Sequence, residues 1–111
     1  MKYGIYQINL TDVQYEDKVV LETYRGVQFG CSVESVMAAK PLYSKVAVID
    51  ANDLEGVFTI GNIGPEYKIE RIAPMHSVSV GDVVVDTNGF ASLCMPMGFQ
   101  QFGKQGEFCG I

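Results

Sequence analysis

The side chain best suited to proton transfer is His76, the only histidine of the chain. Histidine has the unperturbed pKa nearest to neutrality and often serves as a general acid or base. A small hydrolase or transferase would need His76 close to a nucleophile, Cys31 or Ser77, and a carboxylate such as Asp82 to orient the ring. Sequence spacing fixes no such geometry. We therefore assign no catalytic residue and keep this enzyme as an alternative, because His76 and Ser77 could equally tie a loop to the backbone.

Several side chains could bind a metal ion, but their spacing matches no metal motif. They are Asp50, Asp53, Glu55, Asp82, Cys31, Cys94 and Cys109. No twelve-residue calcium loop, two-histidine helix motif or C-x-x-C pair occurs. Asp53 is better explained as a helix cap, and Asp82 as a turn residue that accepts backbone N–H bonds. Since no P-loop or dinucleotide fingerprint is present, we expect neither a metal site nor a cofactor.

The charge of the chain is acidic, with thirteen carboxylates against eight Lys and Arg and a net charge of −5. No run of basic residues could neutralise a row of phosphates, so nucleic acid is not an expected partner. An acidic mimic of nucleic acid, of the antirestriction type, would suit the sign of the charge and stays an alternative. Its carboxylates would have to converge, yet only Glu16 and Asp17 are adjacent.

Length and composition predict one folded domain. The 111 residues are 48% hydrophobic, which is enough for a buried core in a chain of this size. We place this domain at residues 1–102 and a C-terminal tail at 103–111. No apolar block resembles a signal peptide or could span a bilayer, and an odd number of cysteines fits a reducing compartment. We expect a cytoplasmic protein without a membrane partner.

Hydrophobic periodicity predicts alternating strands and helices in the first half of the chain. Residues 2–10 alternate as a strand, and Thr11 with Gln14 forms a capping box for a helix over 12–25 that ends at Gly26. Ser32 opens a second helix over 33–39, and residues 44–51 form the next strand.

The second half predicts a short helix followed by strands. Leu54, Val57 and Phe58 fall on one helical face over 54–60, so Phe58 should pack inward before Gly61 ends the helix. Residues 67–72 alternate as a strand, and 83–86 with 90–95 flank an Asn88-Gly89 hairpin turn. The expected fold is α+β, a mixed or antiparallel sheet of about five strands with two helices packed on one face.

Three segments together resemble the YodL-like domain over roughly residues 44–102. They are Asp53-Leu54-x-x-Val57-Phe58-x-x-Gly61-Asn62, the block His76-Ser77-Val78-Ser79-Val80-Gly81-Asp82-Val83-Val84, and Gly89 with Gly98-Phe99. The chain differs from that pattern at Gly81, where serine is common, and at 94–97, where a tyrosine-rich strand is common. The resemblance implies a small cytoplasmic α+β module, of bacteria, integrative elements or tailed phages, without an established enzymatic activity.

The leading hypothesis is therefore a non-enzymatic accessory protein, encoded by a phage or mobile element, that binds and modulates a bacterial host protein. The candidate binding residues are His76, Ser77, Ser79, Asp82 and Phe99. Val78 and Val80 should point away from the two serines, whose hydroxyls could satisfy buried backbone groups. A homodimer is a further expectation, since residues 3–8 or the strand at Cys94 could form a sheet edge that pairs with a second copy.

Overall fold

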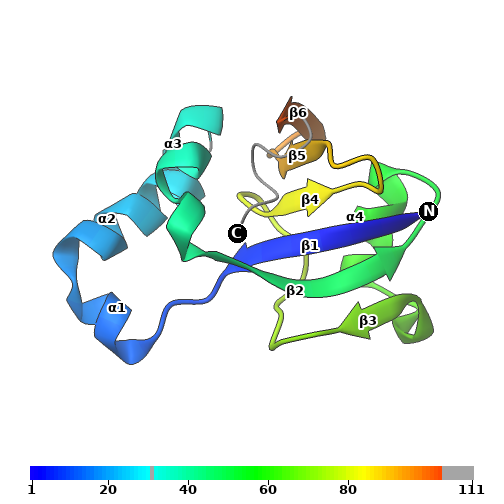
Figure 1. Ribbon diagram of the computed structural model, residues 1–111, viewed down its shortest axis with the longest axis horizontal. Coiled ribbons are helices and arrows are strands. Elements are labelled where there is room, and N and C mark those ends of the chain that lie inside the picture. The colour runs from blue at the N-terminus through cyan, green and yellow to red at the C-terminus, as the bar shows by residue number, and fades with distance from the viewer. Residues whose placement is uncertain (31, 104–111) are drawn as a thin grey trace.

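A sheet of six antiparallel strands forms the body of the computed structural model, which describes residues 1–30 and 32–103 (Figure 1). The strands are β1 (Lys2–Ile8), β2 (Tyr43–Asp50), β3 (Ile69–Arg71), β4 (Val83–Val85), β5 (Ala91–Cys94) and β6 (Phe99–Gly103). Their order across the sheet is β3-β2-β1-β4-β5-β6, so the N-terminal strand lies near the centre. The predicted α+β class is confirmed, with a purely antiparallel sheet and one strand more than expected.

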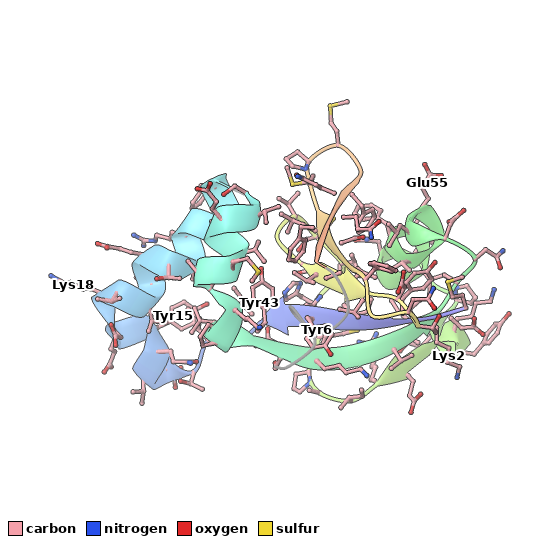
Figure 2. All side chains as sticks on the ribbon, turned by 45° about the horizontal axis from the view of Figure 1, so that its top comes forward. Lys2, Tyr6, Tyr15, Lys18, Tyr43 and Glu55 are labelled. Carbon is pink, nitrogen blue, oxygen red and sulfur yellow. The ribbon has the colours of Figure 1, made fainter. Side chains whose placement is uncertain are left out.

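Four α-helices accompany the sheet. They are α1 (Asp12–Glu16), α2 (Lys18–Arg25), α3 (Val33–Ala38) and α4 (Leu54–Asn62). A π-helical turn, Gly26–Gly30, continues α2, and 3-10 turns precede β2 at Lys40–Leu42 and β3 at Glu66–Lys68. The segment from α1 to α3 stands at one end of the sheet, with Lys18 at its outer tip, whereas α4 lies toward the other end (Figures 1 and 2).

The core has two clusters that use alternate residues of the same strands. One cluster joins Tyr3 and Ile5 of β1 to Val57 of α4. The other joins Tyr6 and Ile8 of β1 to residues around α3. Because neighbouring side chains of a strand point to opposite faces, the two clusters lie on opposite faces of the sheet. The helices are therefore divided between both faces, whereas two helices on a single face were expected.

The predicted helix over 12–25 is two helices, broken at Asp17. The capping box at its start is confirmed, because Gln14 N donates to Thr11 Oγ1 at 3.2 Å and Thr11 N donates to Gln14 Oε1 at 2.8 Å. Asp17 then takes an extended backbone and accepts from Val19 N at 2.9 Å and from Val20 N at 3.3 Å. Aspartate competes with the helix in this way by offering the amides a cap of its own.

Helix α4 begins as predicted and continues beyond its predicted end. Asp53 caps it by accepting from Gly56 N at 2.7 Å. The helix includes Gly61, where an added Cβ would lie 2.3 Å from Val78 Cγ2, so glycine allows close packing here instead of ending the helix. The inward position predicted for Phe58 is wrong, since Val57 is fully buried and Phe58 is 43% exposed on the flank of the helix.

The C-terminal strands follow the prediction up to β5. The Asn88-Gly89 turn joins β4 to β5, and Asp86 Oδ1 secures it by accepting from Asn88 N at 2.9 Å and from Phe90 N at 3.0 Å. Strand β6 was not predicted, and its last residue, Gly103, was placed in the tail. The rest of that tail, residues 104–111, lies outside the described residues, as does Cys31.

Candidate functional site

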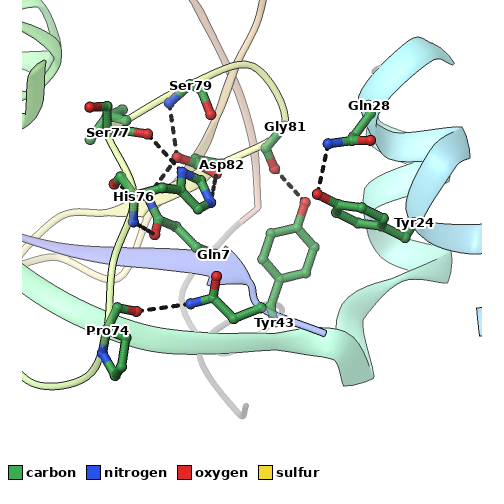
Figure 3. A network of polar contacts seen from close by, with 12 residues as sticks. Gln7, Tyr24, Gln28, Tyr43, Pro74, His76, Ser77, Ser79, Gly81 and Asp82 are labelled. Atoms are coloured by element: carbon green, nitrogen blue, oxygen red, sulfur yellow. Dashed lines mark hydrogen bonds and ion pairs between the residues drawn. The ribbon is translucent and has the colours of Figure 1, made fainter. Parts of the chain in front are cut away.

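One buried amide holds the loop that carries His76. Gln7 of β1 is fully buried, and its Nε2 donates to His76 O and to Asp82 Oδ2, each at 2.9 Å (Figure 3). Its Oε1 accepts from His76 N at 3.1 Å. A single strand residue therefore fixes both ends of the segment 76–82.

Asp82 lies at the centre of this network and is 4% exposed. Its Oδ2 also accepts from Ser79 N at 2.9 Å, which confirms the predicted turn role of this carboxylate. Burial raises the pKa of Asp82 to about 6, although the Ser79 N–H bond, the nearby His76 and the Gln7 amide all favour the charged form.

The His76 ring is hydrogen-bonded through one nitrogen and faces a carboxylate with the other. Nδ1 lies 2.8 Å from Ser77 O, so this nitrogen carries the proton in the neutral ring, and Nε2 lies 4.0 Å from Asp82 Oδ1. A base in a catalytic triad is oriented through one nitrogen and faces its nucleophile with the other. Within residues 1–30 and 32–103, no serine hydroxyl is hydrogen-bonded to this ring, and Cys31 lies outside that part.

His76 lines two hollows, a shallow one of about 220 Å³ beside the end of α4 and a smaller one on the side of Asp82. A cavity of about 30 Å³ lies next to His76 and Asp82, closed on its other side by Tyr24 and Val27. That volume corresponds to roughly one water molecule, which is too little for a substrate. The network around His76 therefore acts as loop support.

Two further contacts hold the same loop. Asn62 of α4 donates through Nδ2 to Val78 O at 2.9 Å, and the Tyr43 hydroxyl donates to Gly81 O. Gly81 has a φ of +94°, and a Cβ there would lie 2.9 Å from Val27 Cγ1. The serine common at this position in YodL-like domains would be strained here. The loop is thus bound to β1, β2 and α4 at once.

An apolar groove of about 640 Å³ lies between α4 and the turn of the β5–β6 hairpin. Its apolar lining consists of Phe58, Val78, Val80, Met95, Pro96 and Phe99. Phe58 is 43% and Val80 is 36% exposed, so large apolar side chains face solvent at its rim. The supported loop supplies the floor through Val78 and Ser79. The apolar groove is therefore a surface feature with a fixed base.

A second hollow of about 480 Å³ adjoins the apolar groove, and Glu55 lines both. Glu55 projects from α4 (Figure 2), and Asp53 and Asp86 add two more carboxylates. Burial raises the pKa of Tyr3 in this hollow, and the charges of Asp86 and Asp53 raise it further. We call this second hollow the acidic end of the groove.

The predicted binding residues lie in three places. Ser79 and Phe99 line the apolar groove, His76 and Asp82 belong to the network beneath it, and Ser77 is exposed beside the end of α4. Sequence reasoning missed Gln7, because its place in an alternating strand gave no sign of burial among polar partners. Phe58 was missed as a surface residue because it shares helical spacing with Leu54.

Comparison of the chain with protein-family models, curated proteins and solved structures gave no match. The resemblance to YodL-like domains therefore stays a prediction from sequence motifs. Among the described residues, no three His, Cys, Asp or Glu side chains are grouped so that they could hold a metal ion. No helix in residues 1–30 or 32–103 has the length and apolar character needed to cross a membrane.

Proposed function

We propose that this protein is a non-enzymatic accessory protein that binds and modulates a bacterial host protein in the cytoplasm, through the apolar groove. The observation that carries the proposal is the pair of exposed apolar side chains, Phe58 and Val80, at the rim of a hollow with a fixed floor. Binding sites for proteins concentrate aromatic and other large apolar side chains in such places. The motif resemblance supports an origin in a phage or mobile element.

The fixed floor supports binding because the loop that forms it is already ordered before a partner binds. Val78 and Ser79 are held by hydrogen bonds from Asn62 and to Asp82. A surface that is already in its bound shape loses less conformational entropy on association. The groove therefore combines exposed apolar area with a low cost of ordering.

The enzyme alternative has less support from the same region. His76 Nδ1 is engaged by the Ser77 carbonyl, Nε2 faces the buried Asp82 carboxylate at 4.0 Å, and the cavity between the ring and Asp82 has room for about one water. Among the described residues, no hydroxyl or thiol is hydrogen-bonded to this ring.

The acidic-mimic alternative requires carboxylates that act together on one face. Several of them have local partners instead. Asp17 and Asp53 cap helices, and Asp82 is buried. Glu66 Oε1 lies 2.6 Å from Arg71 Nε, and Asp50 Oδ1 lies 3.2 Å from the N-terminal amine. These acids also come from different elements, so binding through the apolar groove is the better-supported function.

A crosslinking pull-down from bacterial lysate tests the proposal. The bait is the full chain, compared with Phe58→Gln in the groove and with Tyr67→Gln, which removes an 84% exposed aromatic side chain elsewhere. Loss of an aromatic hot-spot contact typically costs about 2 kcal/mol or more, so we expect Phe58→Gln to recover at least ~10-fold less partner. Tyr67→Gln should recover as much as the natural chain.

Two outcomes would contradict the proposal. One is repeated failure to recover any stoichiometric partner, and the other is a partner retained equally by Phe58→Gln. Far-UV circular dichroism of all three baits ensures that the comparison is made between folded proteins.

A further inference from the structure

We infer that the groove takes an extended protein segment in which a bulky apolar side chain stands two residues from a Lys or Arg. The inference rests on the proposed function and adds the chemistry of the partner. The apolar side chain would enter the apolar groove, and the cation would enter the acidic end beside Glu55.

Strand β6 contributes one residue to each of the two hollows, and this determines the distance between them. Phe99 lies opposite Cys94 and Gln101 lies opposite Ser92, and these two residues of β6 are separated by one position. They therefore point to the same face of the sheet. Phe99 lines the apolar groove and Gln101 lines the acidic end. Two residues of a strand span roughly 7 Å, which sets the distance between an apolar side chain and a cation bound there.

The charge of the acidic end favours a cation. Asp53, Glu55 and Asp86 contribute to its lining, and no Lys or Arg is among the described residues that line either hollow. No described side chain forms an ion pair with Glu55, which is exposed. A partner of opposite charge is favoured at such a surface, both in its approach and in its orientation.

The edge position of β6 favours an extended occupant. In the described part of the chain β6 is the last strand of the sheet. Its sequence, FQQFG, has none of the charges or prolines that usually protect an edge, whereas the opposite edge, β3, is three residues long and carries Glu70 and Arg71. A segment added beside such a strand alternates its side chains with period two, which matches the spacing of the hollows.

Titration of the 15N-labelled full chain with three short peptides tests the inference by NMR. Their central residues are Phe-Ser-Arg, Phe-Ser-Glu and Ala-Ser-Arg, each between Gly-Ser ends. We expect the Phe-Ser-Arg peptide to bind at least about fivefold more tightly than either of the others, since each lacks one of the two contacts. The amide signals of Glu55, Phe99 and Gln101 should move most.

Matched variants separate the two contacts. Glu55→Gln should reduce the preference for the Arg peptide over the Glu peptide by about threefold or more. Glu70→Gln, which removes an exposed carboxylate from β3, should leave that preference unchanged. Phe58→Gln should weaken both Phe-containing peptides together.

Several outcomes would overturn the inference. Equal binding of the Arg and Glu peptides would show that the acidic end does not select a cation. Tighter binding of a peptide that copies residues 104–111 would assign the groove to the chain itself. Concentration-dependent dimers in light scattering that Phe58→Gln abolishes would assign it to a second copy.

The proposed function and the inference can fail separately. If Phe58→Gln no longer recovers a lysate partner and Glu55→Gln still does, the proposed function is supported. The inference that the partner places a Lys or Arg beside Glu55 is then rejected. Selective peptide binding without any partner from lysate supports the chemistry of the groove and rejects the host-protein function.

Discussion

At the scale of single residues, the main feature is the buried polar pair Gln7 and Asp82. Every buried side-chain nitrogen or oxygen among the described residues has a hydrogen-bond partner, so the network is satisfied. Satisfied networks fix one loop conformation, yet a carboxylate placed in them still loses most of its hydration. The raised pKa of Asp82, about 6, reports that cost.

We predict that Asp82→Asn stabilises the protein at neutral pH. A pKa of about 6 in the folded state, in place of 3.8, means that folding favours the protonated form of Asp82. The stability that Asp82 contributes is therefore fully present below about pH 4 and is lost as the pH rises through 6. An asparagine oxygen can still accept from Gln7 and Ser79. Asp82→Asn should therefore raise the unfolding free energy by about 2 kcal/mol more at about pH 7.5 than at about pH 4.

Urea unfolding at the two pH values measures this difference. Glu70→Gln serves as the control, because it also removes one carboxylate but from an exposed position. The assignment fails if Asp82→Asn and Glu70→Gln change the pH dependence of stability equally.

We also predict that Gly61→Ala destabilises the protein by about 1–3 kcal/mol, despite the higher helix propensity of alanine. The added methyl group would lie 2.3 Å from Val78 Cγ2 and force α4 away from the loop. Gly26→Ala is the matched control, since its backbone is helical and nothing lies within 4 Å of the added carbon. Thermal unfolding should separate the two variants, and equal midpoints would contradict the close packing of Gly61.

At the scale of elements, the sequence predicts what local chemistry decides. The capping box at Thr11, the helix start at Ser32 and the Asn88-Gly89 turn are confirmed, because each depends on residues only a few positions apart. Strand β6 could not be predicted, since it has no alternation of apolar and polar residues and is defined by its register with β5. The break at Asp17 was missed because apolar residues keep a helical spacing across it.

The break between α1 and α2 leads to a prediction about Asp17. Asp17→Ala removes the acceptor for Val19 N and Val20 N and should destabilise the protein by about 1 kcal/mol. Asp17→Asn keeps an oxygen in place and should restore most of that loss. Chemical unfolding and amide exchange within α2 measure the effect. If asparagine is no better than alanine, the capping bond does not contribute to stability.

At the scale of the whole molecule, the two core clusters share one sheet. Strand β1 contributes Tyr3 and Ile5 to one cluster and Tyr6 and Ile8 to the other. Neither cluster can lose its packing without disturbing the strand at the centre of both. The protein should therefore unfold in one cooperative step.

Two large-to-small substitutions test this cooperativity, one in each cluster. Ile49→Ala and Leu93→Ala both remove fully buried side chains and should each cost about 2–5 kcal/mol. Far-UV and near-UV circular dichroism should report a single transition that shifts by similar amounts in both variants. Separate transitions, with the cluster around α3 unfolding first in Leu93→Ala, would contradict the shared core.

The candidate site is assembled from residues far apart in the sequence, so the sequence predicts little of it. The apolar groove joins Phe58 of α4 to Phe99 of β6, and the support of its floor begins at Gln7. Only the sheet order brings these positions together. Motif spacing found Ser79 and Phe99, since both lie in the segments that resemble YodL-like domains, but it could not show which face of α4 is exposed.

The central position of β1 also constrains how the chain folds during synthesis. Ile5 lies opposite Ala47 on one side and opposite Val84 on the other, so β1 receives its second neighbour only after β2 and the whole segment up to β4 have been made. Until then, one edge of a strand rich in tyrosine and isoleucine stays open to pairing with other chains. Such distant pairings also slow folding. A ribosome that pauses before β4 is complete would therefore leave this edge of β1 uncovered for longer.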